Sequence, residues 1–412
     1  MQHQLGWLGI VTILTTALLL SQNRRRISPR IVCSGLLLTF LIGIASHWQP
    51  VEILLRTITL SVAYLISFSR SGVQFLLNPD LVNNPKVGGT FLVTVVPLLI
   101  WTSALMSILH YSRALPRLIA SVAWLTRLAF GPGITPGTAC VAAATPLLGQ
   151  TVAPLIVRPL LPRMTRSELM ALMTCGFATM SAPLILLYSQ MLERSRFSQA
   201  MTEIVVASIM SVPAALVLAK ILVPEEESPN PHSLPVEDEA DPSLIDAIAK
   251  GAMDGARLAI TIAVMLLVFK SLLSVGDSIV GYLGQMVMGN ATPVTLQSLL
   301  AVPFHLVARL IGVEARDANA VGSLIGYGVV STEYMAFERL SAQTDLLSER
   351  SITLAIFALA SFANIPSIAM QLACLSEMAP GRKDDLLRLA PRAMMAGLGA
   401  TWLTACVRGL FL

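Results

Sequence analysis

Polar and ionisable residues lie at two places inside apolar sequence, where a helix crossing a lipid bilayer gains nothing from them. The first is Gly149-Gln150-Thr151, which interrupts an apolar stretch shortly before Pro154. The second contains Asp317 and Glu333, two carboxylates among small and apolar neighbours. A carboxylate at membrane depth costs at least about 2.5 kcal/mol, so it faces the protein interior and has a partner there. We therefore expect both carboxylates to have a functional role.

Covalent chemistry is not indicated. The sequence has no Walker-type loop, no HExxH motif, no serine nucleophile elbow and no histidine close to a cysteine. The cysteines are scattered without CxxC spacing, so neither a disulfide framework nor a zinc site is expected: they are Cys33, Cys140, Cys175, Cys374 and Cys406. The sequence therefore predicts a protein that is not an enzyme. Without an ATP motif, uphill transport would have to be driven by an ion gradient.

The composition predicts an all-α polytopic membrane protein. Of its residues, 55% are hydrophobic and only 13% are charged, whereas soluble domains carry roughly 25% charged residues. A helix needs about 20 residues to cross a bilayer, and apolar runs that approach this length recur along the chain. The candidate spans are residues 5–20, 31–46, 89–109, 169–187, 204–222, 252–273, 352–375 and 394–412.

Basic residues gather beside four of these runs. The clusters are Arg24–Arg26 with Arg30, Arg113 with Arg117, Arg163 with Arg166, and Arg382, Lys383, Arg388 and Arg392. All of them are cytoplasmic at once if both termini face outward and eight helices cross, which is the positive-inside pattern. The net charge of +4 thus follows the membrane and indicates no nucleic-acid partner. We predict a multi-pass protein of the bacterial inner membrane.

The chain divides into two comparable halves. Residues 224–243 hold five prolines and seven acidic residues, which is typical of a flexible loop, here cytoplasmic. The predicted parts are N-terminal scaffold helices (1–130), a first repeat with a re-entrant hairpin and a broken helix (131–223), the acidic loop (224–243), a connecting helix (244–295) and a second repeat (296–412).

Interruptions occur in matching order in the two halves. A broken stretch at 132–161 precedes a helix interrupted at 181–183, and a broken stretch at 296–327 precedes one interrupted at 364–366. A proline in mid-membrane frees carbonyls that need partners, so such helices line a cavity enclosed by protein. Paired interruptions point to an inverted-repeat transporter with its site near the midplane. Gly149-Gln150-Thr151 is then the tip of a re-entrant hairpin.

Four motifs together resemble those of the concentrative nucleoside transporters. They are GQTVAPL at 149–155, EARDANAVGSLIG at 314–326, STEYMAF at 331–337 and SFANIPSI at 361–368. The resemblance covers nearly the whole chain. It implies a homotrimer with eight transmembrane helices and two re-entrant hairpins. Each protomer would hold one nucleoside site and couple import to Na⁺ or H⁺, without a cofactor.

The resemblance also implies roles for individual residues. Gln150 and Thr151 match residues that contact the nucleobase, and Asp317 matches the second-hairpin acid that holds ribose hydroxyls. The remaining substrate-binding candidates are Val152, Leu184, Phe362, which packs on the ligand, and Asn364 and Ser367, which contact ribose. Thr145, Leu148, Thr179 and Met180 match a Na⁺ site. Proton coupling is the rival, with Asp317 or Glu333 as the carrier.

The sequence departs from the family pattern in ways that bear on substrate and ion. Val152 replaces the usual glutamate, which removes a hydrogen-bond partner on the base side. Asp317 stands where glutamate is commoner, and Thr145 offers one hydroxyl oxygen in place of an asparagine amide. Two alternatives follow from Val152. One is a transporter for a modified nucleoside such as pseudouridine, and the other is a membrane protein that binds its ligand without moving it.

Overall fold

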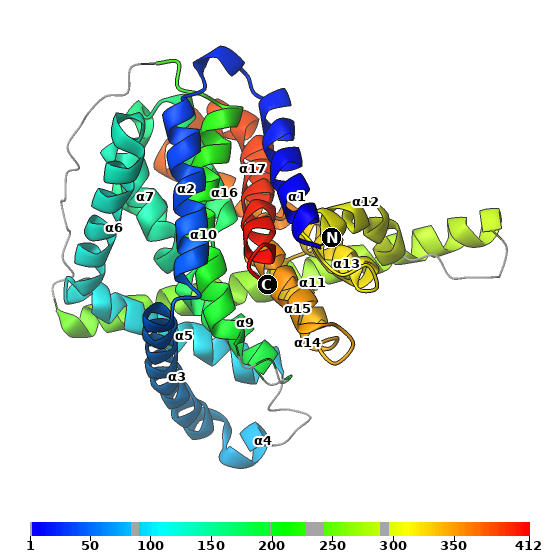
Figure 1. Cartoon of the computed structure of the whole chain (residues 1–412). Coiled ribbons are helices and arrows are strands. Elements are labelled where there is room, and N and C mark those ends of the chain that lie inside the picture. The colour runs from blue at the N-terminus through cyan, green and yellow to red at the C-terminus, as the bar shows by residue number, and fades with distance from the viewer. Residues whose placement is uncertain are drawn as a thin grey trace.

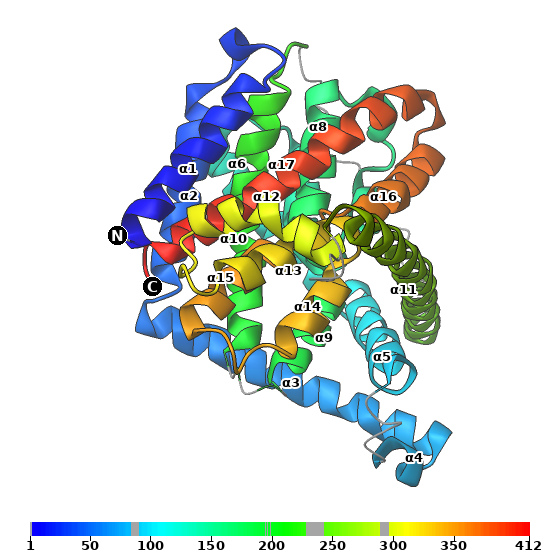
Figure 2. The ribbon, with the colours of Figure 1, turned by 90° about the vertical axis from the view of Figure 1, so that its right-hand side faces the viewer.

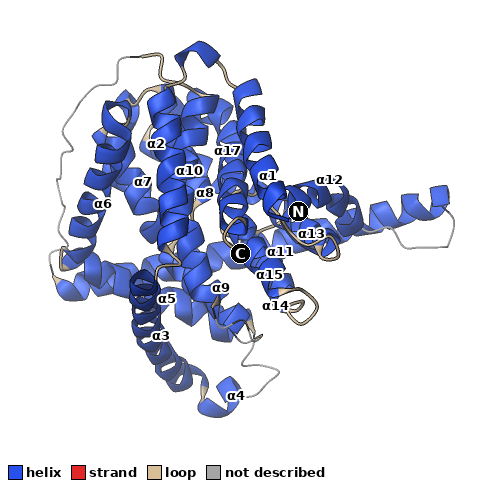
Figure 3. Cartoon of the chain, in the orientation of Figure 1, coloured by secondary structure: helices blue, strands red, loops and turns tan. Residues whose placement is uncertain are grey.

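The computed structural model describes residues 2–83, 90–193, 195, 197, 199–227, 243–288 and 296–412, and these residues form helices and loops without a strand (Figure 3). The helices are α1 (Gln2–Leu19), α2 (Pro29–Ala45), α3 (Gln49–Leu77), α4 (Pro79–Asn83), α5 (Phe91–Tyr111), α6 (Ala114–Phe130), α7 (Pro136–Leu148), α8 (Arg166–Ala178), α9 (Ala182–Glu193), α10 (Ala200–Leu222), α11 (Leu244–Met288), α12 (Leu296–Leu310), α13 (Ala318–Val330), α14 (Glu333–Ser341), α15 (Glu349–Leu359), α16 (Ile365–Met378) and α17 (Lys383–Gly409).

The all-α fold predicted from composition is confirmed, and each predicted span coincides with a helix or a broken helix pair. Among the described residues, four helical segments are long and apolar enough to cross a membrane, namely Phe91–Tyr111, Arg166–Glu193, Ala200–Leu222 and Leu244–Met286. Two other predicted spans, at the positions of α1 and α2, are shorter apolar helices. The sequence reasoning did not resolve α3, α6 and α12 as separate helices. Polar residues alternate with apolar ones along all three, so none stands out as a continuous apolar run.

Helix α10 lies at the centre of the molecule. It packs against α2 on one side and α17 on the other, and α1 lies beside α17 (Figure 1). Helices α5 and α11 pack along each other at the edge of this core, while α3 extends away from it (Figure 2). The two chain ends lie close together in both views. Both termini therefore lie on the same side of the fold.

The same succession of elements occurs twice. In the first repeat, α7 leads through a tip to the 3₁₀ turn Ala153–Val157, then come α8, a break, α9 and the intact α10. In the second repeat, α13 leads through a tip to α14, then come α15, a break, α16 and the intact α17. The second hairpin thus spans 318–341, later than the stretch 296–327 expected from the sequence. The reason is that α12 is a separate helix, which ends before a turn with positive φ at Gly312.

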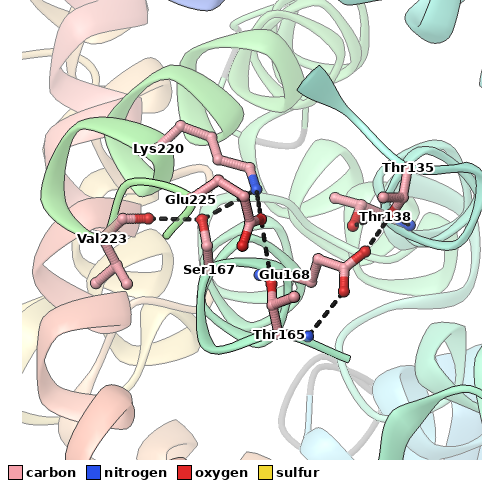
Figure 4. A network of polar contacts seen from close by, with 8 residues as sticks. All are labelled: Thr135, Thr138, Thr165, Ser167, Glu168, Lys220, Val223 and Glu225. Atoms are coloured by element: carbon pink, nitrogen blue, oxygen red, sulfur yellow. Dashed lines mark hydrogen bonds and ion pairs between the residues drawn. The ribbon is translucent and has the colours of Figure 1, made fainter. Parts of the chain in front are cut away.

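Helices α7 and α8 begin at one polar network, drawn in Figure 4. Thr165 caps α8 in a capping box with Glu168, whose Oε2 accepts from the Thr165 backbone N–H at 2.8 Å. The same carboxylate accepts a hydrogen bond from Thr135, the N-cap residue of α7. Both helices have 13 residues and thus a length of about 20 Å. Their C-terminal ends therefore reach the same depth in the protein.

The end of α10 joins this network. Lys220 is 4% exposed and forms an ion pair of 3.0 Å with Glu225, which also accepts from the Thr165 hydroxyl. Ser167 accepts from the Lys220 Nζ at 3.0 Å and donates to the Val223 carbonyl. Glu225 belongs to the predicted acidic loop, of which residues 228–242 lie outside the described residues. The start of that segment is thus anchored to the helices that carry the first hairpin.

An equivalent carboxylate joins the helices of the second repeat. Asp317 Oδ2 accepts from the Ser348 backbone N–H at 3.1 Å and from its hydroxyl at 3.0 Å. Asp317 precedes α13 and Ser348 caps α15, so the two helices begin side by side. They have 13 and 11 residues. Their ends therefore also arrive at similar depth, opposite those of α7 and α8.

A buried ion pair fastens α17 to α10, and its loss should destabilise the fold. Arg408 Nη2 contacts Glu203 Oε1, and the two side chains are only 9% and 5% exposed. Removing one partner of a buried pair costs about 3–5 kcal/mol, because the other charge stays buried alone. We expect Arg408→Leu to lower the thermal unfolding midpoint of the detergent-solubilised protein strongly. The double variant Arg408→Leu/Glu203→Leu should restore most of the loss; equal loss in both would contradict a role for the pair.

Candidate functional site

The tip of the first hairpin is built on a glycine. Gly149 ends α7 with φ +83° and ψ 174°, a conformation essentially confined to glycine. A Cβ on it would lie 2.9 Å from the Cβ of Ser181, in the break between α8 and α9. The tip therefore packs directly on that break. It carries Gln150, which is 3% exposed and has no hydrogen-bond partner at either amide atom.

The two broken helices contact each other at their breaks. The backbone N–H of Phe362, between α15 and α16, donates to the Phe177 carbonyl of α8 at 2.8 Å. Two residues further on, Asn364 caps α16 by accepting from the Ser367 N–H at 2.9 Å. Because its Oδ1 is used as the cap, the Asn364 Nδ2 points elsewhere. It donates to Glu333 Oε2 at 2.6 Å.

Glu333 is the acid at the tip of the second hairpin. It begins α14, directly after Ser331 and Thr332 link α13 to α14. Its Oε1 accepts from the Tyr188 hydroxyl of α9 at 3.1 Å. Within the part of the chain that the structure describes, no basic side chain forms an ion pair with it. A carboxylate held in this way can accept from ligand hydroxyls or take up a cation.

The structure corrects the position predicted for Asp317. Its carboxylate lies at the start of α13 and accepts a hydrogen bond from Ser348 at the start of α15. The hairpin tip is at the other end of α13. The 13 residues of α13 separate the two ends by about 20 Å. Asp317 therefore joins helix ends, and Glu333 is the carboxylate that lies beside Asn364.

Most other predicted substrate residues lie at the tip or at the breaks. Leu184 and Ser367 are buried in the first turns of α9 and α16, and Phe362 is 8% exposed. The Thr151 carbonyl accepts from the Cys374 thiol of α16 at 3.1 Å, so the first tip also contacts α16. Val152 is 41% exposed and brings no polar atom to the site.

The residues predicted for Na⁺ come from the ends of α7 and α8. Thr145 and Thr179 are fully buried, and their hydroxyls donate to the carbonyls of Ala142 and Cys175, which leaves oxygen lone pairs free to accept. Leu148 is the last residue of α7. Met180 follows α8 and exchanges backbone hydrogen bonds with the Ser208 hydroxyl at 3.4 and 3.5 Å. The carbonyl-rich C-terminal ends of two helices attract a cation.

Sequence reasoning missed three residues of this region: Tyr188, Ser208 and Gln371. Tyr188 holds Glu333, Ser208 holds Met180, and Gln371 donates to the Met173 carbonyl at 3.2 Å. Each lies in a largely apolar helix, so the only signal was a polar group at membrane depth.

Three family profiles match the chain. One described as "Na+ dependent nucleoside transporter C-terminus" matches residues 203–409, and its N-terminal counterpart matches residues 8–80. A third, described as "Nucleoside recognition", matches residues 92–195.

Relatives and solved structures agree with these profiles. The chain is 32% identical to the uncharacterized transporter YutK of Bacillus subtilis over 99% of both chains, and 28% identical to the nucleoside permease NupC of Helicobacter pylori over 98% of this chain and 96% of that protein. It spans 60% of the length of human solute carrier family 28 member 3, at 30% identity over 99% of this chain. The structure of CNTnw in an inward-facing substrate-bound state superposes with a TM-score of 0.91, at 32% identity, over 100% of this chain and 98% of that one.

Two hairpin tips that contact two broken helices are the architecture of a secondary transporter. The chain belongs to the concentrative nucleoside transporter family. Members of this family are transporters and not enzymes, as the sequence predicted.

Asn364 should matter for both the site and the helix it caps. Asn364→Ala removes the cap of α16, at about 0.5–2 kcal/mol, and the amide donor to Glu333. We expect weaker nucleoside binding together with a lower unfolding midpoint. Asn364→Asp keeps a capping oxygen but puts a second acid beside Glu333 in place of the donor, so it should bind weakly although α16 stays capped. Normal binding by the purified Asn364→Asp variant in calorimetry would contradict the assignment.

Proposed function

We propose that the protein imports nucleosides across the bacterial inner membrane by symport with protons. The observation that carries the proposal is the pair of Glu333 and Asn364, held at 2.6 Å between the second hairpin tip and the break before α16. The unpartnered amide of Gln150 lies on the opposite hairpin tip. These groups supply acceptors and donors for a ribose on one side and for a base on the other.

The ribose contacts follow from hydrogen-bond chemistry. The Glu333 carboxylate accepts from one or both hydroxyls of a diol, and the Asn364 Nδ2 donates to a hydroxyl oxygen. Ser367, in the first turn of α16, adds a third polar contact, and Phe362 packs on the ligand. A site built to bond hydroxyls rejects analogues that lack them, because its buried polar groups are then left unpaired. We therefore expect strong discrimination against 2′,3′-dideoxynucleosides.

Coupling follows from the charge of Glu333. Glu333 is partly buried and forms no ion pair within the described residues. An unpaired carboxylate is costly in the membrane, so a transport cycle that carries it along with the substrate favours its neutralisation by a cation. Thr145 in place of an amide leaves the region beside α7 and α8 with only hydroxyl and carbonyl oxygens. Proton binding at Glu333 needs no set of coordinating oxygens, whereas Na⁺ binding does. The transport cycle then moves one nucleoside with the proton that neutralises this acid.

A second candidate is Na⁺ coupling at Thr145, Leu148, Thr179 and Met180. It is favoured by the meeting of the α7 and α8 C-terminal ends, where carbonyl dipoles point at one region. Na⁺ accepts hydroxyl and carbonyl oxygens, so the residues present fit the ion. Under this mechanism Thr179→Val would abolish accumulation, whereas under proton coupling it would leave accumulation nearly unchanged.

The decisive experiment is uptake of labelled uridine into proteoliposomes with separately imposed proton and sodium gradients. We expect accumulation under an inward proton gradient that collapses with a protonophore, and none under sodium alone. Accumulation under sodium alone would move the coupling to Thr145 and Thr179. Transport of pseudouridine without uridine would support a modified nucleoside as cargo. Saturable binding without uptake under either gradient would contradict the proposed transport.

We further propose a homotrimer in the bilayer with both termini outside the cytoplasm. Only 11% of the most apolar 18-residue stretch of the long helix α11 is buried within the subunit. Most of the surface of this stretch is therefore available to lipid or to neighbouring subunits. Native mass spectrometry in detergent tests the trimer, and a cysteine-reactive probe at either chain end of a cysteine-substituted variant tests the orientation.

A further inference from the structure

Helix α16 brings a second buried amide towards the first hairpin. Gln371 is fully buried, and its Oε1 has no hydrogen-bond partner although its Nε2 donates to the Met173 carbonyl. Gln150 on the hairpin tip has two unpartnered amide atoms. A buried polar atom without a partner costs about 1–3 kcal/mol. Such atoms mark a place where another group binds or where the side chains rearrange to meet.

Gly176 on α8 lies between the Gln371 amide and the start of the Gln150 side chain. A Cβ added to Gly176 would lie 2.4 Å from Gln371 Nε2 and 3.0 Å from Gln150 Cβ. Only a residue without a side chain leaves room for both groups at this surface. The hairpin tip, α8 and α16 thus converge at one point, from three separate parts of the sequence.

The residues of α16 that face the site lie three or four positions apart. Asn364, Ser367, Gln371 and Cys374 therefore share one face of the helix. Asn364 at one end contacts Glu333, and Cys374 at the other end contacts the Thr151 carbonyl of the first tip. Gln371 lies between these two contacts. The face that begins at the ribose groups thus continues to the groups expected to meet the base.

We propose that Gln371 is a positioning residue for nucleobase recognition, which rests on the proposed function. Its Nε2 is committed to Met173, so its Oε1 is left to accept one N–H of Gln150. That bond fixes which way the Gln150 amide faces. The Gln150 Oε1 and its second N–H then pair with a neighbouring donor and acceptor on the base, such as the N3–H and a carbonyl of uracil. Because Val152 offers no polar atom, the polar contacts to the base are left to this amide and to Thr151.

The test is uridine uptake by Gln371→Met, which keeps the volume but loses the acceptor, together with the donor to the Met173 carbonyl. We expect KM for uridine to rise about 3- to 10-fold, the value of one hydrogen bond, with kcat nearly unchanged. Inhibition by methyl β-riboside, which has no base, should stay at the wild-type level. An equal loss for uridine and the riboside would show a general structural role and overturn the proposal. Unchanged uridine KM would overturn it as well.

A double-variant cycle shows whether Gln371 acts through Gln150. With Gln150→Ala already present, Gln371→Met should add no further rise in KM, because no amide remains to be positioned. Effects that multiply would mean that the two residues act separately, which contradicts the proposal. If wild-type protein transports no nucleoside at all, the proposed function itself fails. Wild-type transport with base-independent effects of Gln371→Met refutes only the positioning role.

Gly176→Ala gives an independent test that leaves both amides in place. Its methyl group would displace the Gln371 amide and press against the Gln150 side chain. The same base-dependent rise in KM is therefore expected. Gly399→Ala is the matched control, since its Cβ would meet only the Leu218 and Ile13 side chains and neither amide. A rise in KM for Gly399→Ala as large as that for Gly176→Ala would overturn the proposal.

Discussion

Glu333→Gln should abolish proton-driven accumulation of nucleoside while leaving exchange of substrate across the membrane measurable. The glutamine keeps an acceptor beside Tyr188 and Asn364, but it takes up no proton on going from one side to the other. Loss of a hydrogen bond to a charged group costs about 1.5–3 kcal/mol, so affinity should also fall about 10- to 100-fold. Counterflow and gradient-driven uptake in the same proteoliposomes separate the two effects.

The matched control is Glu338→Gln, an exposed acid on the same helix α14. It should accumulate nucleoside like the wild-type protein. Undiminished accumulation by Glu333→Gln under a proton gradient would refute Glu333 as the proton carrier. If only its sodium-driven uptake survived, the cation would instead be bound beside Thr145 and Thr179.

Gly149→Ala should inactivate transport through the backbone of the first tip. A backbone conformation confined to glycine costs of order 1–3 kcal/mol for other residues, and the new Cβ would lie 2.9 Å from the Cβ of Ser181. The tip would relieve this strain by turning, which moves Gln150 and Thr151. We expect at least about a 10-fold fall in kcat/KM for uridine, because roughly 1.4 kcal/mol corresponds to tenfold.

Two further variants identify the cause. Gly381→Ala, at a glycine with open space around it, should be silent. Adding Ser181→Gly to Gly149→Ala removes the steric contact but not the backbone strain, so it should restore little activity. Full recovery in the double variant would show that crowding rather than the glycine conformation holds the tip in place.

Local polarity located one hairpin tip correctly and misplaced the other. At Gly149-Gln150-Thr151 three residues that disfavour an apolar helix stand together, so the end of α7 was visible in the sequence. In the second repeat, Asp317 and Glu333 are both acids beside apolar helical sequence. Their spacing does not show which of them lies at the hairpin tip. The hydrogen bonds from Ser348 to Asp317 join the start of α13 to the start of α15, and Glu333 begins α14 beyond the other end of α13.

The sequence by itself determined the class of fold, the spans and the family resemblance, because apolar length, helix breakers and short motifs are all properties of neighbouring residues. Only the tertiary structure decided which distant groups lie together: Glu333 with Asn364 and Tyr188, Phe362 with Phe177, and Gln371 and Gln150 with Gly176. Glu168 joins the starts of α7 and α8, Asp317 joins the starts of α13 and α15, and the similar lengths within each pair bring the helix ends to similar depth. Periodicity shows on which face of a helix a residue lies. The depth of that residue in the protein depends on where its helix begins, which tertiary contacts determine.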